Sequence, residues 1–412
     1  MLKLYRLISI ILIPIIFINI YFRILNNKED KKRFEERFGK ASVKKPTKKK
    51  LIWIHAASVG EFKSSKIIIE SYYKNYTILV STTTKTAADY ALKYYSKKII
   101  HQYAPYDVTH WVKRYITFWK PELVIWIESD LWPNTLTLLK KNKIKSILLN
   151  ARISPESYSR WKIFGNSYEK LIETFSAVFA QSKDDLKRIK KLTNKKIEFI
   201  GNLKLSNKFE KKIINQNRNN TNCSIMIASS HTEEEELLVS MIKKLFIKFN
   251  NIQFYFAPRH INRATNIQKL FRQHQLISCI ESNKKNQKNN IMIIDSFGNL
   301  SKYFNKSDIV FLGGSISNHG GHNPVEPAKY KCAIISGNNV FNWHNIYKEM
   351  LKQKACFLIN NIEKLEKTIE KLITNKDILK KTKQNALKYA NKKFFNEEKL
   401  KDVINSSLIK NA

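Results

Sequence analysis

Short apolar runs recur along most of this 412-residue chain, and helical stretches separate most of them. Runs of this kind are typical of strands buried on both faces of a parallel sheet. The pattern predicts a first set of strands at residues 51–55, 76–81, 98–102, 123–127, 146–150, 177–180 and 197–200. It then restarts, with strands expected at residues 224–228, 253–257, 291–294, 308–312, 333–336 and 355–358. Strands that alternate with helices predict an α/β fold with parallel, doubly wound sheets.

A polar, Asn-rich stretch at residues 207–222 separates the two sets of strands and is the predicted linker. It divides the chain into a domain at 28–206 and a second domain at 223–412, whose Lys/Asn-rich tail from residue 363 is expected to form helices. We therefore predict two Rossmann-like domains that face a central cleft. Such sheets bind ligands beyond the carboxyl ends of their strands.

The first 27 residues have a different character. Residues 7–22 are almost wholly apolar and basic residues follow at once, beginning with Arg23. We interpret residues 1–27 as a membrane anchor, because no small-residue cleavage site follows the apolar run. The run is slightly shorter than the roughly 20 residues of a spanning helix and contains Pro14, so a spanning helix and a helix lying in the interface both remain open. The basic flank predicts that the rest of the chain is cytoplasmic.

The formal charge of +40, from 74 basic and 34 acidic residues, points to an anionic partner. An anionic membrane surface or a phosphorylated substrate explains it better than nucleic acid, because the basic residues are spread along the chain and no nucleic-acid-binding signature is visible. The four cysteines show no metal-site spacing, which fits a reduced cytoplasmic protein.

Residues 311–328 combine four glycines with a helix start. The strand at 308–312 runs into Gly313 and Gly314, and Gly320 and Gly321 precede Asn323-Pro324. Glycines let backbone N–H groups approach a ligand, and a helix N-terminus favours a phosphate. Glu326 could then accept hydrogen bonds from a ribose. An ordinary glycine-rich turn is the alternative, but the added His-Asn-Pro-x-Glu-Pro sequence favours a nucleotide site.

Charged side chains follow several other predicted strands, where they would face the same cleft. A carboxylate such as Glu61 could act as a general base there, although a carboxylate that only complements the helix dipole is common. Arg152 could pair with a carboxylate or phosphate. These strand-end residues are Ser58, Glu61, Glu128, Asp130, Arg152, Lys204 and Arg259.

Taken together, these motifs resemble the 3-deoxy-D-manno-oct-2-ulosonic acid (Kdo) transferases of lipopolysaccharide synthesis, and the resemblance covers essentially the whole chain. The matching strings are residues 36–39, 55–61, 128–134, 150–154, 201–204, 258–260, 313–315 and 320–327. The resemblance implies a two-domain GT-B glycosyltransferase that uses CMP-Kdo without a metal. It also implies a lipid A precursor, a tetraacylated disaccharide bisphosphate, as acceptor of an inverting transfer.

The resemblance also implies roles for individual residues. Glu61 would be the catalytic base, and Glu128 and Lys204 would act at the transition state. Ser58, Asp130 and Arg152 would support the site or the acceptor. CMP would contact three segments of the second domain, which contain Pro258, Arg259, Phe297, Gly298, Asn299, Asn323, Pro324, Val325 and Glu326.

The chain departs from the family pattern at Asp130 and Asn299, where Glu is usual, and at Glu233, where Gly is frequent. The implied location is the cytoplasmic face of the bacterial inner membrane, with CMP-Kdo, the lipid A precursor and anionic lipids as partners and no nucleic acid. Two alternatives remain. One is a UDP-sugar transferase or sugar-nucleotide epimerase with the same fold, and the other is a non-enzymatic protein that binds membranes or nucleic acid.

Overall fold

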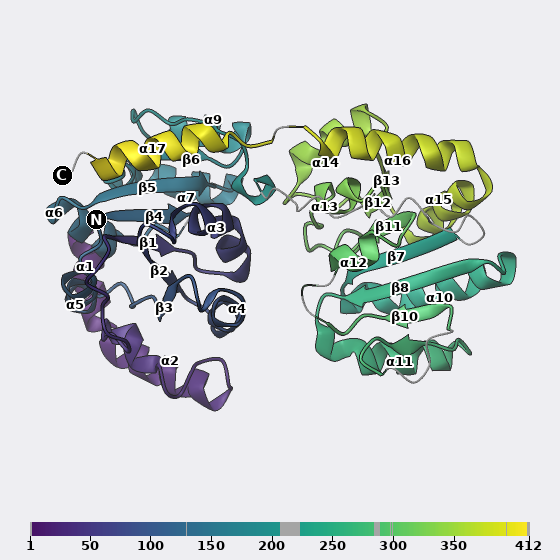
Figure 1. The fold of residues 1–412 in the computed structure, drawn as a ribbon, viewed down its shortest axis with the longest axis horizontal. Helices are drawn as coiled ribbons and strands as arrows, with labels where there is room; N and C mark the ends of the chain where they lie inside the picture. The colour runs from purple at the N-terminus through teal and green to yellow at the C-terminus, as the bar shows by residue number, and fades with distance from the viewer. Residues whose placement is uncertain are drawn as a thin grey trace. The chain divides into compact units, whose positions relative to one another are not determined.

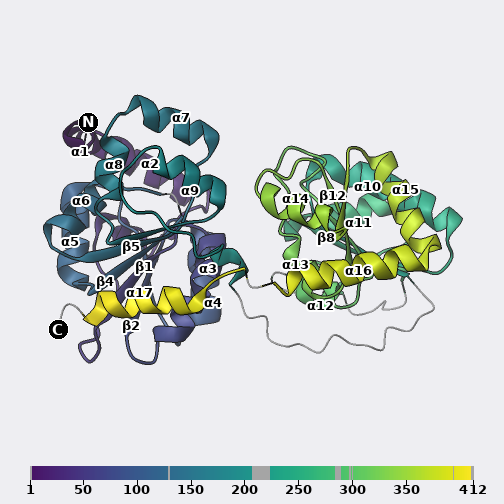
Figure 2. The same ribbon diagram turned by 90° about the horizontal axis from the view of Figure 1, so that it is seen from above.

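The computed structural model describes residues 2–128, 130–206, 223–283, 289–296, 298, 300–392 and 394–409. The chain divides into two compact units, Met1–Phe209 with Lys393–Ala412, and Glu210–Lys392 (Figures 1 and 2). The predicted linker at 207–222 lies outside the described residues. Each unit is described by itself below.

The first unit is built on a six-stranded parallel sheet of order β3-β2-β1-β4-β5-β6. Because β1 and β4 are neighbours, the loops that follow them leave the same edge of the sheet side by side. The strands are β1 (Leu51–His55), β2 (Thr77–Thr82), β3 (Ile100–Tyr103), β4 (Leu123–Ile127), β5 (Lys145–Ala151) and β6 (Ala177–Ala180). The sequence prediction is confirmed for these six strands, with ends that differ by at most two residues.

Helices cover both faces of this sheet. On one face, α3 (Val59–Tyr72) and α4 (Lys85–Tyr95) pack on the strands together with α17 (Glu397–Ile409). The other face is covered by α5 (Thr109–Trp119), α6 (Pro133–Lys141), α8 (Ser167–Ile172) and α9 (Lys183–Lys190). The second face is rich in aromatic side chains, among which Trp53, Trp119 and Trp126 are fully buried.

The C-terminal helix α17 belongs to the first unit, so the assignment of all of residues 223–412 to the second domain is wrong for the tail. Leu400, Ile404 and Leu408 form the buried face of α17 and join the core beneath β1 and β4. The carbonyl of Ile200 also accepts a hydrogen bond from the backbone N–H of Asn396. The spacing of apolar residues predicts the helix, but it does not say which sheet the helix covers.

The second unit contains a seven-stranded parallel sheet of order β13-β12-β11-β7-β8-β10-β9. Its core lies between the sheet and the helices α10 (Thr232–Lys248), α11 (Ala264–Gln273) and α15 (Ile362–Thr374). Helices α12 (Leu300–Phe304), α13 (Val325–Lys329), α14 (His344–Lys352) and α16 (Lys376–Ala390) complete the unit. The strands are β7 (Cys223–Ser230), β8 (Ile252–Pro258), β9 (Cys279–Ile280), β10 (Ile291–Ile293), β11 (Ile309–Leu312), β12 (Ala333–Gly337) and β13 (Cys356–Ile359).

One predicted strand differs from the structure. Residues 197–200 form no regular strand, and Glu198 makes only an isolated bridge with Phe179. In the segment after the apolar N-terminus, a short 3-10 helix, η1 (Phe34–Phe38), ends at Gly39 with a φ of +73°. A side chain at position 39 would meet the carbonyl oxygen of Trp111 at 2.0 Å, so only glycine permits this close approach.

The apolar N-terminus forms two helices, α1 (Leu2–Ile11) and α2 (Ile13–Leu25), rather than one. Pro14 lies in the first turn of α2, and the two helices are bent by 58°. Among the described residues no single helix has the length and apolar composition to cross a bilayer, although the bent pair together meets this criterion. The pair lies against the first unit, where Ile20 packs with Phe38 and Trp111.

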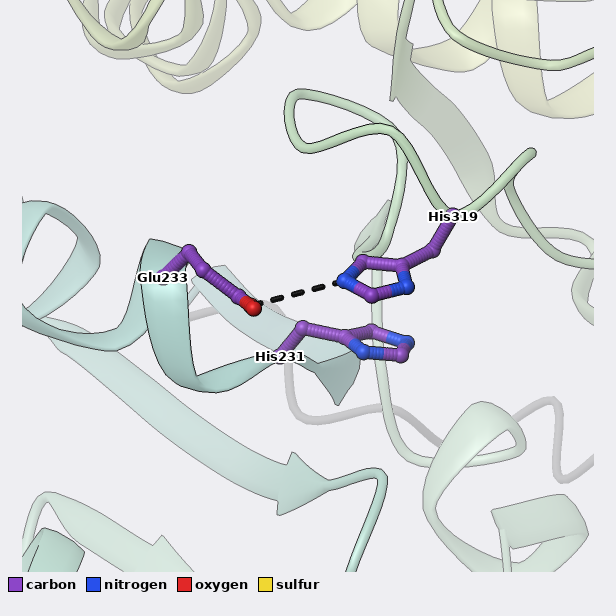
Figure 3. Close-up of side chains that lie close together, drawn as sticks. All are labelled: His231, Glu233 and His319. Atoms are coloured by element: carbon purple, nitrogen blue, oxygen red, sulfur yellow. Dashed lines mark ion pairs between the residues drawn. The ribbon is translucent and has the colours of Figure 1, made fainter.

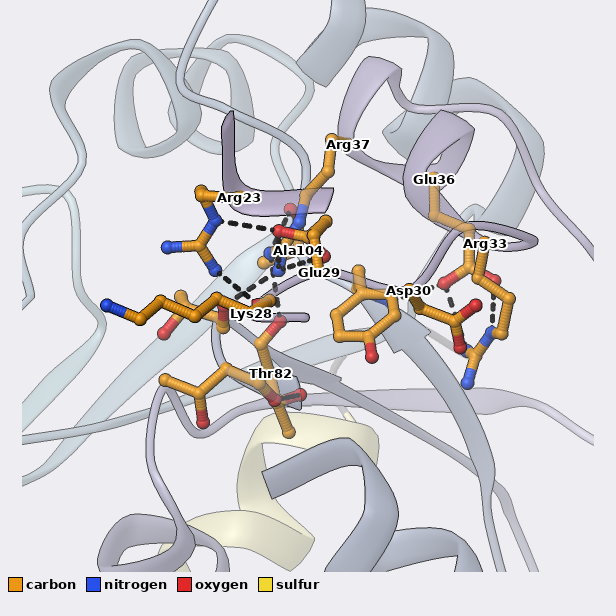
Figure 4. A network of polar contacts seen from close by, with 12 residues as sticks. Arg23, Lys28, Glu29, Asp30, Arg33, Glu36, Arg37, Thr82 and Ala104 are labelled. Carbon is orange, nitrogen blue, oxygen red and sulfur yellow. Dashed lines mark hydrogen bonds and ion pairs between the residues drawn. The ribbon is translucent and has the colours of Figure 1, made fainter. Parts of the chain in front are cut away.

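A buried network of charges fastens the segment after α2 to the carboxyl ends of β2 and β3 (Figure 4). The Arg37 guanidinium donates to the Glu29 carboxylate at 3.0 Å and to the carbonyl of Thr83 at 2.7 Å. The Glu36 carboxylate accepts from the backbone N–H of Tyr103 and pairs with Arg33. The Glu36-Arg37-Phe38-Gly39 string of the sequence is therefore structural, since each of its residues is buried or fixed by a close contact.

We predict that Arg37→Met lowers the free energy of unfolding by about 3–5 kcal/mol, because it removes a buried cation and leaves the buried Glu29 carboxylate to the partly exposed Arg23. The control is Lys40→Met, which breaks the exposed ion pair with Glu35 and should cost less than about 1 kcal/mol. Urea unfolding followed by circular dichroism measures both values. Equal stabilities of the two variants would contradict a stabilising role for the network.

Candidate active site

Glu61 lies in the first turn of α3, directly after β1. The N-cap residue Ser58 accepts from the Glu61 N–H at 3.3 Å and donates its own hydroxyl to the Glu61 carboxylate at 3.1 Å. The other carboxylate oxygen accepts from the backbone N–H of Ala57 at 2.7 Å. The carboxyl group of Glu61 is thus held in one place by the loop that the sequence predicted to carry it.

The surroundings raise the pKa of Glu61 to about 7. Burial is the largest cause, and the negative charge of Glu128 is the next, while the hydrogen bonds from Ala57 and Ser58 act in the opposite direction. A carboxyl group with this pKa can take up a proton and release it near neutral pH, which suits a general base.

Glu128 follows β4 and is 8% exposed. Its carboxylate lies 2.6 Å from the Lys204 ammonium group, and the Asn150 amide donates to the same oxygen at 3.3 Å. The backbone at Glu128 has a φ of +68°, in the left-handed region that a non-glycine residue seldom adopts. Strain of this kind persists where the surroundings fix a side chain, and it is frequent at functional sites.

Asn150 was not singled out from the sequence, yet it joins the ends of two loops. Besides donating to Glu128, its side-chain oxygen accepts from the backbone N–H of Leu203 at 3.1 Å. Leu203 begins the short 3-10 helix η2 (Leu203–Leu205), which carries Lys204. The backbone φ of Asn150 is +59°, which is unusual for a residue other than glycine and would have singled Asn150 out. The sequence, however, does not reveal backbone angles.

A cavity of about 310 Å³ opens beside Glu128 in the first unit. Its wall includes Glu128, Asp130 and Arg152, together with the start of α7 (Pro155–Ile163). The structure therefore brings the predicted residues of this unit into one region: Glu61, Glu128 and Asp130 interact electrostatically, Lys204 pairs with Glu128, and Arg152 shares the cavity.

In the second unit, residues 313–321 form a loop with four glycines, called the glycine loop below, and the Glu234 carboxylate occupies its inside. It accepts from the backbone N–H groups of Gly314 at 2.7 Å, Ser315 at 3.1 Å, Ile316 at 3.1 Å and Ser317 at 3.2 Å. A buried carboxylate from α10 thus already accepts the hydrogen bonds of these four N–H groups, whereas the predicted seat of the phosphate at the helix start, Asn323-Pro324, stays a prediction. Glu234 was not singled out from the sequence, because a carboxylate in the first turn of a helix is common.

The remaining predicted nucleotide residues lie in separate loops of the second unit. Arg259 follows β8 and is exposed, and its charge helps to lower the pKa values of His231 and His322, after the larger effect of burial. The side-chain oxygen of Asn323 accepts from the Val325 N–H at 3.0 Å and so completes the start of α13.

Helix α13 is only five residues long, so its dipole is a weaker attraction for phosphate than the sequence suggested. Glu326, Pro324 and Val325 lie at its start, Pro258 ends β8, and Gly298 has a φ of +88°. Phe297 and Asn299 fall outside the described residues.

His231, Glu233 and His319 gather at the edge of the glycine loop (Figure 3). The two imidazole rings are stacked with centroids 3.8 Å apart, and His319 lies 3.4 Å from the Glu233 carboxylate. The potential ligand atoms lie within 4.8 Å of one another. Parallel rings direct their in-plane lone pairs side by side rather than at a common point, so the observed arrangement is a stacked pair with an ion pair.

We predict that the Glu61 carboxyl group titrates near pH 7 and that Glu128→Gln lowers this pKa, because it removes a nearby negative charge. Carbon-detected NMR of labelled glutamate side chains measures both values. Glu70→Gln, at the other end of α3, is the control and should leave the titration unchanged. A Glu61 pKa near 4.5 in the unaltered protein would contradict the effect of burial.

Comparison with known sequences identifies relatives over nearly the whole chain. The family model described as 3-Deoxy-D-manno-octulosonic-acid transferase (kdotransferase) matches residues 32–207. A 3-deoxy-D-manno-octulosonic acid transferase of Rickettsia bellii is 32% identical over 96% of this chain and 98% of its own length. The enzyme of that name from Haemophilus influenzae is 28% identical over 84% of each chain.

Solved structures share the fold at low sequence identity. A glycosyltransferase from Rickettsia africae superposes with a TM-score of 0.58 at 15% identity, over 89% of this chain and 100% of its own. A UDP-GlcNAc 2-epimerase from Neisseria meningitidis gives a TM-score of 0.56 at 14% identity, over 88% of this chain and 100% of its own. Both likenesses confirm the predicted α/β fold with two Rossmann-like sheets, and neither distinguishes a transferase from an epimerase.

The sequence relatives make that distinction, since similarity at this level extends over both units. The chain belongs to the 3-deoxy-D-manno-octulosonic acid transferase family and is a glycosyltransferase.

Proposed function

We propose that the protein transfers Kdo from CMP-Kdo to a hydroxyl group of the tetraacylated disaccharide bisphosphate that precedes lipid A, with inversion at the anomeric carbon. The observation that carries this proposal is the carboxyl group of Glu61, which has a pKa of about 7 and lies close to the Glu128–Lys204 ion pair. One base is what a single displacement at an anomeric carbon requires on the acceptor side.

In the proposed reaction, Glu61 removes the proton of the acceptor hydroxyl while the oxygen attacks the anomeric carbon of Kdo. The bond from that carbon to the phosphate oxygen breaks, CMP departs as an anion, and the proton remains on Glu61. Burial favours this outcome because it stabilises the protonated, neutral form of Glu61 that the step produces. Ser58 and the Ala57 N–H keep the carboxylate directed as it reacts.

Glu128 and Lys204 are proposed to act on the charge that develops in this step. The Lys204 ammonium group can stabilise an anionic oxygen of the donor, and the Glu128 carboxylate can face the positive charge at the anomeric carbon. The ion pair between them, with a distance of 2.6 Å, and the hydrogen bond from Asn150 fix both groups in place before substrate binds. Preorganised charges of this kind need little rearrangement in the transition state.

CMP is proposed to bind the second unit at Pro258-Arg259, at Phe297-Gly298-Asn299 and at Asn323 to Glu326. The exposed Arg259 guanidinium supplies positive charge for the phosphate at the end of β8. With Arg259 and Lys204 providing cations, we propose that the reaction needs no divalent metal.

We propose that the protein acts at the cytoplasmic face of the inner membrane, held there by the bent helix pair. Outward-facing side chains on α1 and α2 are large, apolar and more than half exposed, among them Leu4, Leu7, Ile11, Ile15, Ile18 and Phe22. Exposed apolar surface on this scale is typical of a membrane interaction site. An acceptor whose acyl chains lie in the bilayer would then be presented to an enzyme at its surface.

The test of the catalytic base is Glu61→Gln. We expect transfer from CMP-Kdo to fall by about 10²–10⁴-fold, since the amide accepts no proton, while affinity for CMP is kept. The control is Glu70→Gln on the same helix, and the product is identified by mass spectrometry. Near-normal turnover in Glu61→Gln would remove the base role, and transfer from a UDP-sugar instead of CMP-Kdo would overturn the proposed function.

The test of the membrane surface is the double variant Ile15→Glu/Ile18→Glu, which charges the outer face of α2. We expect its binding to vesicles with anionic lipids to fall at least about tenfold, as two apolar side chains are lost from the interface. Activity on a detergent-dispersed acceptor should remain. Leu92→Glu, an exposed apolar position on α4, is the control, and equal vesicle binding by both variants would refute the surface.

These substitutions test attachment more directly than deletion of residues 1–22. Deletion would remove the buried Ile20 together with the exposed side chains and would uncover Phe38 and Trp111. Loss of activity in such a truncation would therefore report a damaged first unit as readily as a lost membrane contact.

A further inference from the structure

The cavity of the first unit combines charged groups with aromatic side chains, and its volume of about 310 Å³ is at the small end of ligand sites, which have roughly 300–1,000 Å³. The Glu128 and Asp130 side chains lie on its wall after β4, and Arg152 and Ser154 lie on its wall after β5. Trp161 and Tyr168 add aromatic surface. All of these residues belong to the first unit, so the cavity needs no other part of the chain to be complete.

The outer wall of this cavity is helix α7, which is unlike the other long helices of the sheet. None of its residues is buried, and Figure 2 shows it at the outside of the first unit. The Ser154 hydroxyl accepts from the Ser157 N–H at 3.1 Å and fixes its start, and the Trp161 ring packs 5.2 Å from Tyr168. Tyr158 and Trp161 pack against the core as partly buried side chains, so α7 closes the polar cavity while it adds no fully buried residue.

We propose that this cavity binds the phosphorylated amino-sugar unit of the acceptor that offers the attacking hydroxyl, which rests on the proposed function. The two carboxylates accept hydrogen bonds from sugar hydroxyl groups, and they repel a phosphate. The Arg152 guanidinium binds a phosphate through parallel N–H bonds. The sugar therefore lies with its hydroxyl groups toward Glu128 and its phosphate toward Arg152.

The aromatic rings supply the remaining surface of a sugar site. A pyranose ring has an apolar face of C–H groups, which packs on an aromatic ring, and Trp161 presents one on the inner side of α7. Just beyond it, Ile163 is 80% exposed and Phe164 is 44% exposed. Along α7, the polar cavity is therefore followed by an exposed apolar end. A glycolipid has the same order, with a polar headgroup followed by acyl chains.

The position of the cavity relative to the proposed base supports the same orientation. Glu128 lies on the cavity wall and also lies near enough to Glu61 to raise its pKa. A sugar whose hydroxyl groups contact Glu128 therefore places one of them near the base that the reaction needs. The phosphate at Arg152 then accounts for selection of a phosphorylated acceptor over a neutral one.

The decisive variant is Ser157→Trp, which fills the cavity from α7, with Ser159→Trp on the exposed side of the same helix as its matched control. We expect Ser157→Trp to raise KM for the acceptor at least about tenfold while the affinity for CMP stays unchanged, because only the acceptor subsite is blocked. Ser159→Trp should behave as the unaltered protein. Equal KM values for the two variants would overturn the proposal.

A second measurement covers direct binding and the role of the phosphate. The probe is the glucosamine disaccharide bisphosphate without acyl chains, compared by calorimetry with its dephosphorylated form. We expect the unaltered protein to prefer the phosphorylated probe by about tenfold or more, and Arg152→Gln to bind both alike. A preference that persists in Arg152→Gln, or probe binding that persists in Ser157→Trp, would refute the site.

These outcomes separate failure of the subsite from failure of the proposed function. If the unaltered protein transfers Kdo and Ser157→Trp has a normal KM, the transfer stands and the cavity is not the acceptor subsite. If the unaltered protein transfers no Kdo to the acceptor, the proposed function fails. If the probe also does not bind, the cavity is not a phosphorylated-sugar site either. Probe binding that is lost in Ser157→Trp supports the cavity as a phosphorylated-sugar site.

Discussion

The ion pair between Glu128 and Lys204 is the interaction on which the first unit's site depends. It joins the loop after β4 to η2, and Asn150, at the end of β5, contacts both partners' loops. Three chain segments far apart in the sequence are thereby fixed at one edge of the sheet. The electrostatic effect extends to Glu61 after β1, because a carboxylate held in place at Glu128 raises the pKa of its neighbour.

The second unit uses a carboxylate in a related but distinct way. Glu234 satisfies four successive backbone N–H groups, so the glycine loop keeps its shape without a bound ligand. Gly313 and Gly314 are needed because a side chain at either position would meet Ser229, Ser230 or His231 within about 3 Å. Gly313 and Gly314 therefore serve the close packing of this loop on α10 and β7.

The N-terminal helices show how an apolar segment can serve two purposes. Ile20 and its neighbours on α2 are buried against Phe38 and Trp111, while the opposite face exposes large apolar side chains. The Glu29–Arg37 network continues this attachment to the ends of β2 and β3. An apolar surface held on the unit that carries Glu61 would fix the distance between this proposed base and a bilayer.

Sequence alone predicted most of the strands in their order, because a buried parallel strand is a continuous apolar run whose length and flanks distinguish it from a helix, but it missed the short β9. It also placed Glu61, Glu128 and Arg152 after strands, and parallel topology puts such ends at one edge, whereas the strand expected before Lys204 did not form. The sequence also predicted helices in the tail that contains residues 397–409. The pattern did not show which sheet α17 covers, because Leu400, Ile404 and Leu408 would fit either core.

Only the tertiary structure decided which polar groups are partners. From the sequence, the backbone N–H groups after Gly313 were expected to approach a ligand, but the carboxylate that accepts from Gly314 to Ser317 comes from α10, some 80 residues earlier in the chain. Asn150 is recognised only from its backbone angle and its two contacts across the sheet edge. The pKa of Glu61 is raised by burial and by Glu128, a neighbour 67 positions away in the sequence. Side-chain hydrogen bonds and electrostatic shifts depend on distances of a few ångströms between segments remote in sequence, and those distances exist only once the chain has folded.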